Sequence, residues 1–121
     1  MLNDTNLPPK VNLQDLIKND KNILQIYSRL KTAFNPTQMF LFGSRAMGTN
    51  REDSDYDIAV VVAHTDKDRI ENMNTARKAL FDLDITAEVF VYGQQEFDEW
   101  KNELNSIPEA AYNLGVELTL G

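Results

Sequence analysis

The sequence contains no cysteine and a single histidine, His64. Disulfides and thiolate metal sites are therefore excluded, and one imidazole cannot build a multi-histidine zinc site. Metal sites made of carboxylate oxygens remain open, because 19 residues are acidic. No apolar run approaches the roughly 20 residues of a membrane span, and the start, MLNDTNLPPK, lacks the pattern of a signal peptide. We expect a cytoplasmic protein.

Basic residues are also scarce, since 12 Lys and Arg leave the chain with a net charge of −7. Counterion release from DNA or RNA requires clustered Lys and Arg, so general nucleic-acid binding is not expected. The length, 121 residues, is that of one domain. Pro8-Pro9 and few apolar groups predict a loose lead-in over residues 1–12, followed by one domain over residues 13–121.

Hydrophobic periodicity predicts short helices and strands in alternation. The expected helices cover residues 13–34 (with a break at 19–22, where Asp20 is a candidate N-cap), residues 65–83, a segment marked by Phe97, Trp100 and Leu104, and the segment between Ser106 and Gly115. The expected strands cover residues 39–42, 58–62, 86–92 and 116–120. Because the first two strands are almost wholly apolar, both of their faces should be covered. We therefore expect an α/β (α+β) domain, with a single small mixed sheet flanked by helices.

Two of these helices carry more detailed expectations. The helix over residues 65–83 should begin at the capping sequence Thr65–Asp68. Its buried stripe should consist of Ile70, Met73, Leu80 and Leu83, with Ala76 between them. Gly115 should close the last helix in the manner of a C′ glycine.

A Gly-Ser pair, Gly43-Ser44, follows the strand over residues 39–42. Glycine permits the close approach of a phosphate, and the serine hydroxyl adds a donor. If residues 44–47 form a helical turn, their backbone N–H groups lie at a helix N-terminus and favour an anion. Arg45 is a candidate for the same phosphate, or for an ion pair with Glu52 or Asp53, and both alternatives stay open.

Two aspartates, Asp55 and Asp57, enter the strand over residues 58–62. Residues i and i+2 of a strand point to the same face, so the two carboxylates converge. Convergent carboxylates repel each other unless a cation lies between them, and Mg²⁺ prefers such oxygen ligands. Glu88, in the middle of the strand over residues 86–92, is placed to add a third carboxylate. The competing interpretations are a solvated strand end for the aspartates and an exposed edge-strand charge for Glu88.

The pattern of Gly43-Ser44, ten intervening residues, Asp55-Tyr56-Asp57 and a strand carrying Glu88 resembles the DNA polymerase β-type nucleotidyltransferase superfamily. The resemblance is strongest to its short branch, the minimal nucleotidyltransferases. It implies the nucleotidyltransferase fold, with Gly43 and Ser44 at the nucleotide triphosphate and Arg45 left as the candidate described above. It also implies two Mg²⁺ ions at Asp55, Asp57 and Glu88, with Glu88 helping to activate the acceptor hydroxyl. The third position is usually Asp, so Glu88 is a departure.

Many small members of this branch resemble antitoxins that pair with an all-α HEPN ribonuclease and attach AMP from ATP to a toxin tyrosine. The resemblance therefore implies an adenylyltransferase whose acceptor is a partner protein, since no second substrate-binding domain is visible. A catalytically idle antitoxin that covers the toxin is the first alternative. A small-molecule transferase of the aminoglycoside type is the second. Association with a second copy or with the toxin is left open.

Overall fold

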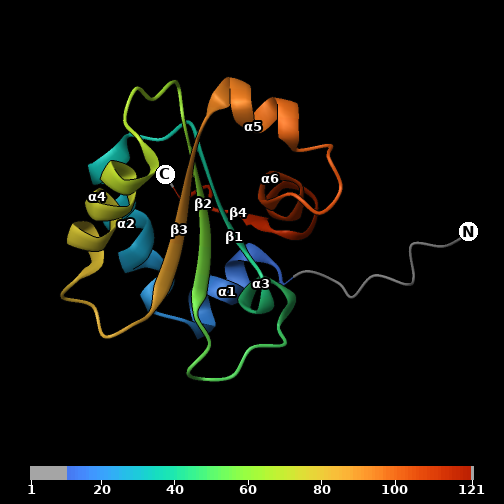
Figure 1. The fold of residues 1–121 in the computed structure, drawn as a ribbon. Helices are drawn as coiled ribbons and strands as arrows, with labels where there is room; N and C mark the ends of the chain where they lie inside the picture. The colour runs from blue at the N-terminus through green and yellow to red at the C-terminus, as the bar shows by residue number, and fades with distance from the viewer. Residues whose placement is uncertain (1–10, 121) are drawn as a thin grey trace, which may run out of the picture.

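The structure of the protein is a computed structural model that describes residues 11–120. A four-stranded sheet runs through its middle (Figure 1). The strands are β1 (Gln38–Phe42), β2 (Tyr56–Val62), β3 (Ala87–Gly93) and β4 (Val116–Glu117), in the order β3-β2-β1-β4. β1 pairs with β2 and with β4 in antiparallel fashion, and β3 pairs with β2 in parallel. The predicted mixed sheet in an α/β domain is confirmed.

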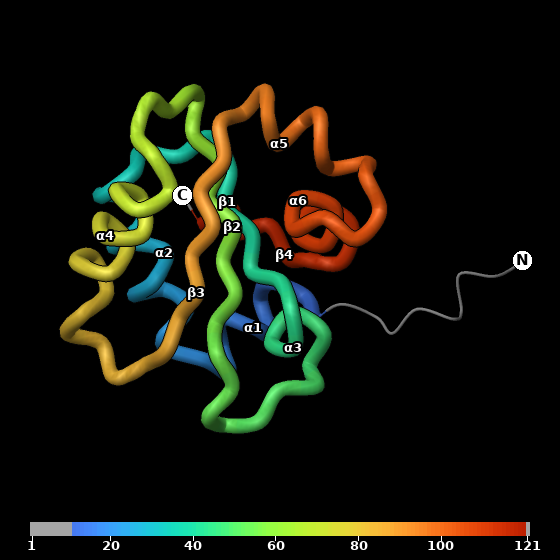
Figure 2. The backbone as a smooth tube through the Cα atoms, in the orientation of Figure 1, coloured from blue at the N-terminus to red at the C-terminus, as the bar shows by residue number. Residues whose placement is uncertain are grey.

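The helices lie on the two faces of this sheet (Figures 1 and 2). The helices of one face are α1 (Leu13–Asn19), α2 (Asn22–Phe34) and α4 (Arg69–Leu80), and those of the other are α5 (Gln94–Trp100) and α6 (Ile107–Glu109), which continues as a π-helical turn, Ala110–Leu114. A short helix, α3 (Ser44–Met47), follows β1. Within residues 11–120, none of these helices is long and apolar enough to cross a bilayer.

The two faces of the sheet carry two separate hydrophobic clusters, because successive strand residues point to opposite sides. The cluster under α1, α2 and α4 contains Met39, Leu41, Ile58 and Val60 from the strands, together with Ile23, Ile26 and Leu30 from α2. The cluster under α5 contains Phe40, Phe42, Ala59 and Val61 with Phe97, whose ring stacks on Phe40 at a centroid distance of 5.3 Å. Coverage of both faces of β1 and β2 was predicted and is confirmed.

The N-terminal part of the domain is held by local caps. The lead-in predicted over residues 1–12 falls outside the described residues except for its last two positions. Asn12 accepts a hydrogen bond from the backbone N–H of Asp15 and so caps α1. The predicted break before α2 is present, and Asp20 accepts a hydrogen bond from the N–H of Asn22 through its side chain, although Lys21 occupies the N-cap position.

The buried stripe predicted for α4 is right for Ala76 and Leu80, which are buried, and wrong for Ile70 and Met73. The helix begins at Arg69, and Asp68 caps it in a capping box with Glu71, so the residues from Thr65 onward precede the helix. Its buried positions are Asn72, Ala76 and Leu80, at a spacing of four. Ile70 and Met73 are 68% and 44% exposed, because each residue turns the helix by about 100° and their positions lie off the buried line of Asn72, Ala76 and Leu80. A small residue, Ala76, lets the helix approach the strands instead.

Two expectations for the C-terminal part also differ from the structure. Of the apolar residues predicted to mark one helix, only Phe97 is buried, whereas Trp100 and Leu104 are 51% and 83% exposed, because α5 ends at Trp100. Gly115 has a φ of −89° and is not a left-handed C′ residue. A Cβ there would lie 2.3 Å from the carbonyl oxygen of Ala111, so the glycine is required by close backbone approach.

Candidate active site

The strand register places two of the predicted carboxylates side by side. Phe42 of β1 pairs with Asp57 of β2, and Asp57 pairs with Glu88 of β3. Residues aligned across neighbouring strands project to the same face of a sheet. Asp57 and Glu88 therefore share the face that carries Phe42, beyond the end of the cluster around Phe97. Asp55 lies just before β2 and two residues from Asp57.

Electrostatic interactions connect all three carboxylates. Burial raises the pKa of Asp57, and the negative charges of Glu88 and Asp55 raise it further. Within residues 11–120, none of the three side chains forms a hydrogen bond or an ion pair with another part of the chain. A group of carboxylates without a cationic partner is unfavourable by itself and attracts a cation.

Gly43 brings the backbone directly against Asp57. Its φ is +77°, which side-chain-bearing residues rarely adopt, and a Cβ built on it would lie 2.3 Å from Asp57 Oδ2. The carbonyl of Gly43 accepts hydrogen bonds from the N–H groups of Ala46 and Met47, at 3.1 and 3.2 Å, and so begins α3. In the described part of the chain the half-buried hydroxyl of Ser44 has no hydrogen-bond partner. The Ser44 hydroxyl and the first backbone N–H groups of α3 are therefore free donors that lie next to the carboxylates.

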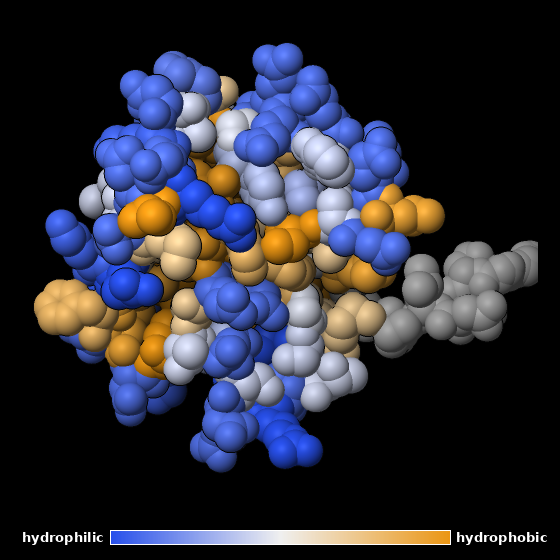
Figure 3. Space-filling model, viewed as in Figure 1, coloured by the Kyte–Doolittle hydropathy of each residue, from blue (hydrophilic) through white to orange (hydrophobic). Residues whose placement is uncertain are grey.

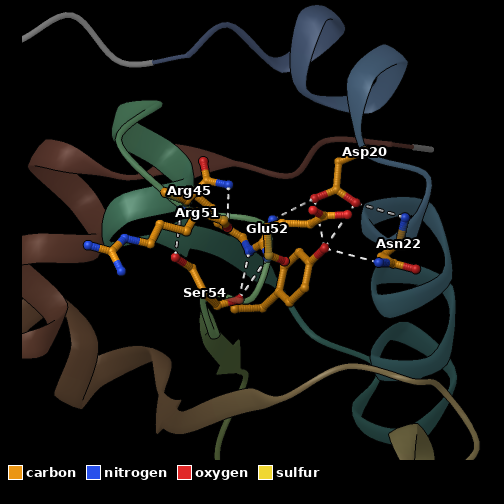
Figure 4. A network of polar contacts seen from close by, with 8 residues as sticks. Asp20, Asn22, Arg45, Arg51, Glu52 and Ser54 are labelled. Atoms are coloured by element: carbon orange, nitrogen blue, oxygen red, sulfur yellow. Dashed lines mark hydrogen bonds and ion pairs between the residues drawn. The ribbon is translucent and has the colours of Figure 1, made fainter.

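Arg45 is buried, with 8% of its surface exposed, and its guanidinium is occupied by the chain itself (Figure 4). It donates to the carbonyl of Ser54 from Nε and Nη2, at 3.1 and 2.7 Å, and to the carbonyl of Glu52 at 3.0 Å. Its ion pair is with Asp20 at 3.2 Å, not with the Glu52 or Asp53 side chain that the sequence suggested. These contacts favour a structural role for Arg45 over contact with a phosphate.

The sequence did not reveal the residues that complete this network. The guanidinium of Arg45 lies 3.9 Å from the centroid of the Tyr56 ring. The Tyr56 hydroxyl donates to Asp20 at 2.8 Å and accepts from Asn22 at 3.1 Å. Tyr56 is thereby anchored on the face of the sheet that α1, α2 and α4 cover, and Asp57, the next residue of β2, projects to the opposite face. The only available signal was an aromatic residue between two aspartates, which does not identify its partners.

We expect the Arg45 network to carry much of the stability of the loop that precedes the carboxylates. Arg45→Ala removes the N–H groups that donate to the carbonyls of Ser54 and Glu52, and it leaves Asp20 without its ion-pair partner. The free energy of unfolding should therefore fall by about 3 kcal/mol. Urea denaturation measures this change. The matched control is Arg51→Ala, whose exposed side chain should contribute less than about 0.5 kcal/mol. Equal stability of the two variants would contradict the structural role.

The described residues contain no preformed metal site made of protein ligands alone. Among residues 11–120, no three acidic or histidine side chains stand close enough together to hold an ion unaided. Mg²⁺ does not require such a cage, because it keeps several waters and binds through one or two carboxylates together with substrate phosphates. The unpaired oxygens of Asp55, Asp57 and Glu88, next to the free donors that follow Gly43, fit that mode of binding.

Comparison with known proteins gives one match. Residues 21–96 match the family model described as Polymerase beta, Nucleotidyltransferase. The matched stretch covers more than half of the chain, runs from the Lys21 N-cap of α2 into α5, and includes Gly43 and all three carboxylates. No match was found among the curated proteins.

Proposed function

The chain belongs to the polymerase beta nucleotidyltransferase family. From that premise we propose that it transfers AMP from ATP to a hydroxyl group of a partner protein, with Mg²⁺ as cofactor: the hydroxyl oxygen bonds to the α-phosphorus, the bond to the β-phosphate breaks, and pyrophosphate leaves. The observation that carries the proposal is the group of unpaired carboxylates beside Gly43. The partner that we propose is an all-α HEPN toxin, with this chain as its antitoxin. This part of the proposal is supported by the resemblance to minimal nucleotidyltransferases.

Each residue has a defined task in this reaction. The backbone around Gly43 and the hydroxyl of Ser44 bind and orient the triphosphate, because the absence of a Cβ at Gly43 lets the backbone lie directly against the Asp57 carboxylate. Asp55 and Asp57 would hold the metal, and a metal bound there would supply charge neutralisation at the phosphates and a lower pKa for the acceptor hydroxyl. Glu88 lies on the open edge strand, where an acceptor can approach, and takes the proton from the attacking hydroxyl.

The transfer itself can be tested directly. The purified chain is incubated with ATP, Mg²⁺ and a HEPN protein from a neighbouring reading frame, and the mass of the HEPN protein is then measured. We expect the mass to increase by one AMP residue. If the HEPN protein is neutralised and no adduct forms, the chain acts by covering its partner, and the proposed transfer is wrong.

Asp57→Asn should change thermal stability in opposite directions without and with the ligand. The pKa of Asp57 is raised in the folded state, so the ionised carboxylate lowers the free energy of unfolding at pH values above that pKa. The contribution of this one group becomes favourable only as the pH falls and the group is protonated. With EDTA at neutral pH, the variant should therefore melt a few degrees above the wild type. With saturating Mg²⁺ and ATP, the wild type should gain more, since only its site binds both.

Asp53→Asn is the matched control, because Asp53 is exposed in the same loop and is not among the charges that raise the pKa of Asp57. Its melting temperature should follow that of the wild type under both conditions. Identical melting curves for Asp57→Asn and Asp53→Asn would argue against a metal and nucleotide site at Asp57.

A further inference from the structure

A groove of about 610 Å³ follows the open side of β3. β2 pairs with β3 on one side, and on the other side no strand of residues 11–120 is hydrogen-bonded to it. The lining of the groove includes every residue of β3 from Ala87 to Tyr92, and successive strand residues point to opposite faces. The groove therefore runs along the backbone edge itself, where a further strand would lie. Edges with free backbone groups readily pair with another chain.

The backbone of β3 fixes how a further strand would pair with it. Tyr56 donates its N–H to the carbonyl of Thr86 at 2.9 Å, so the even-numbered residues of β3 turn their N–H and C=O groups toward β2. The odd-numbered residues, including Ala87 and Val89, turn theirs outward. In an antiparallel addition, the residue opposite Glu88 therefore belongs to a non-hydrogen-bonded pair, in which the Cα atoms are only about 4.5 Å apart. The two side chains of such a pair lie close together.

The face of this edge that points toward α5 carries Glu88. The Glu88 side chain is exposed, and the residue paired with it on the inner side is Asp57 of β2. A side chain opposite Glu88 on an added strand would point to the same face. A hydroxyl group at that position would lie beside the carboxylate to which we assign its proton, and on the outer side of the carboxylates to which we assign the metal.

The opposite face of the edge is apolar and cationic. Val89 and Val91 pack on this face, and Met73, which is 44% exposed, lines the groove from α4. Figure 3 shows apolar atoms over α4 and β3 between polar ones. Three cations line the groove on the side of α4: Lys67, Arg69 and Arg77. None of the three forms an ion pair within the described residues. In a chain with a net charge of −7, this group of cations favours an acidic occupant.

A second copy of β3 does not match these two faces. Its residues on the side of α4 would be Ala87, Val89 and Val91, none of which is acidic, so the cations of the groove would stay unpaired. On the side of α5, antiparallel pairing would bring Glu88 of one copy toward the strand end that carries Glu96 in the other. Like charges brought together in this way oppose pairing. A segment that alternates a hydroxyl residue with apolar and acidic residues matches both faces.

We propose that the acceptor reaches the site as an extended segment of the partner protein, which adds antiparallel to β3 and presents its hydroxyl opposite Glu88. The occupant of the edge is then the acceptor itself. The residues on either side of the hydroxyl point into the groove, and acidic residues three positions away face its cations. The hydroxyl oxygen bonds to the α-phosphorus of ATP, pyrophosphate leaves, and the proton passes to Glu88. This transfer rests on the proposed function, whereas docking of the segment does not.

Binding of a synthetic peptide to the full chain, without ATP or Mg²⁺, tests docking alone. The probe is the capped, dye-labelled heptapeptide EQVYVQE, in which the tyrosine is the acceptor and the valines and glutamates are placed for the groove. Fluorescence polarisation should show saturable binding. N-methylation of both valines removes the N–H groups that face the edge and should weaken binding at least about tenfold. N-methylation of both glutamines, whose N–H groups point away, is the matched control and should change binding less than about threefold.

Variants of the chain test the charges of the groove with the same probe. Arg69→Glu combined with Arg77→Glu should weaken peptide binding at least about tenfold. Lys18→Glu combined with Arg51→Glu, an equal change of charge at exposed positions outside the groove, should leave it unchanged. Absence of saturable binding, or equal weakening by the two pairs of N-methyl groups, overturns the proposal. A dimer in sedimentation velocity that the peptide does not dissociate would assign the edge to a second copy and overturns it as well.

Addition of ATP and Mg²⁺ to the same mixture tests transfer to the docked segment. The tyrosine peptide should gain the mass of one AMP residue. The peptide with phenylalanine in place of tyrosine should bind equally and gain no mass, because it lacks only the hydroxyl. AMP on the HEPN protein but not on the bound peptide contradicts the acceptor strand and leaves the proposed function standing. AMP on neither, together with the expected effects of N-methylation, contradicts the proposed transfer and supports docking at β3.

Discussion

Replacing Asp55 and Asp57 together by Asn is expected to lower the rate of AMP transfer at least about 1,000-fold. The two carboxylates have no cationic partner among the described residues, so their charge is available for a metal and the phosphates. Asn keeps the size of each side chain but removes that charge. Binding of the partner protein should remain nearly unchanged, because only small polar groups are altered. The measurement is the AMP adduct on the partner by mass spectrometry, beside partner affinity by calorimetry.

The control variant for this experiment is Asp53→Asn combined with Glu52→Gln. These residues carry the same charge in the same loop, and both are exposed. Their replacement should leave the rate of AMP transfer within about threefold of the wild type, since the charges of exposed side chains are screened by salt. Adduct formation at the wild-type rate in Asp55→Asn/Asp57→Asn would remove these residues from the catalytic machinery.

Gly43→Ala is expected to eliminate nucleotide binding. The added Cβ would lie 2.3 Å from Asp57 Oδ2, so the carboxylate or the strand exit must move. Isothermal titration with Mg²⁺ and a non-hydrolysable ATP analogue should give no measurable heat of binding.

Gly48→Ala separates this effect from simple backbone strain. Gly48 has a φ of +74°, close to the +77° of Gly43, so alanine costs about 1 kcal/mol or somewhat more at either position. Its Cβ would meet only Val11 Cγ2, at 3.2 Å, and no carboxylate. Gly48→Ala should therefore lose stability but still bind the analogue. Equal binding by the two variants would exclude a phosphate site at Gly43.

Several features of the site could be predicted because they depend on short stretches of chain. The two-residue spacing keeps Asp55 close to Asp57, and the negative charge of Asp55 contributes to the raised pKa of Asp57, although Asp55 lies just before β2. A Gly-Ser pair after an apolar strand predicts a tight exit, and the structure has Gly43 there at positive φ. The fold class followed from periodicity in the same way, and the family match agrees with it.

Other features could not be read from local patterns. Arg45 was assigned to a phosphate or a neighbouring acid, but its ion-pair partner is Asp20, 25 residues away in the sequence. In α4 the apolar residues Ile70 and Met73 indicated the wrong buried face, because an apolar residue predicts burial only where a surface is available to cover it. Whether that surface belongs to the same chain or to another chain is a question of tertiary and quaternary structure.

The sequence by itself determined the order of helices and strands and, through the motif of Gly43-Ser44 and Asp55-Tyr56-Asp57, the family, because both depend on spacing along the backbone. Only the tertiary structure decided that Glu88 lies next to Asp57 and that Gly43 touches its carboxylate. It also decided that β3 is an edge strand with an open side. Pairing and register of distant strands depend on how the whole chain buries its apolar faces, and a pattern of residues in one segment does not contain that information.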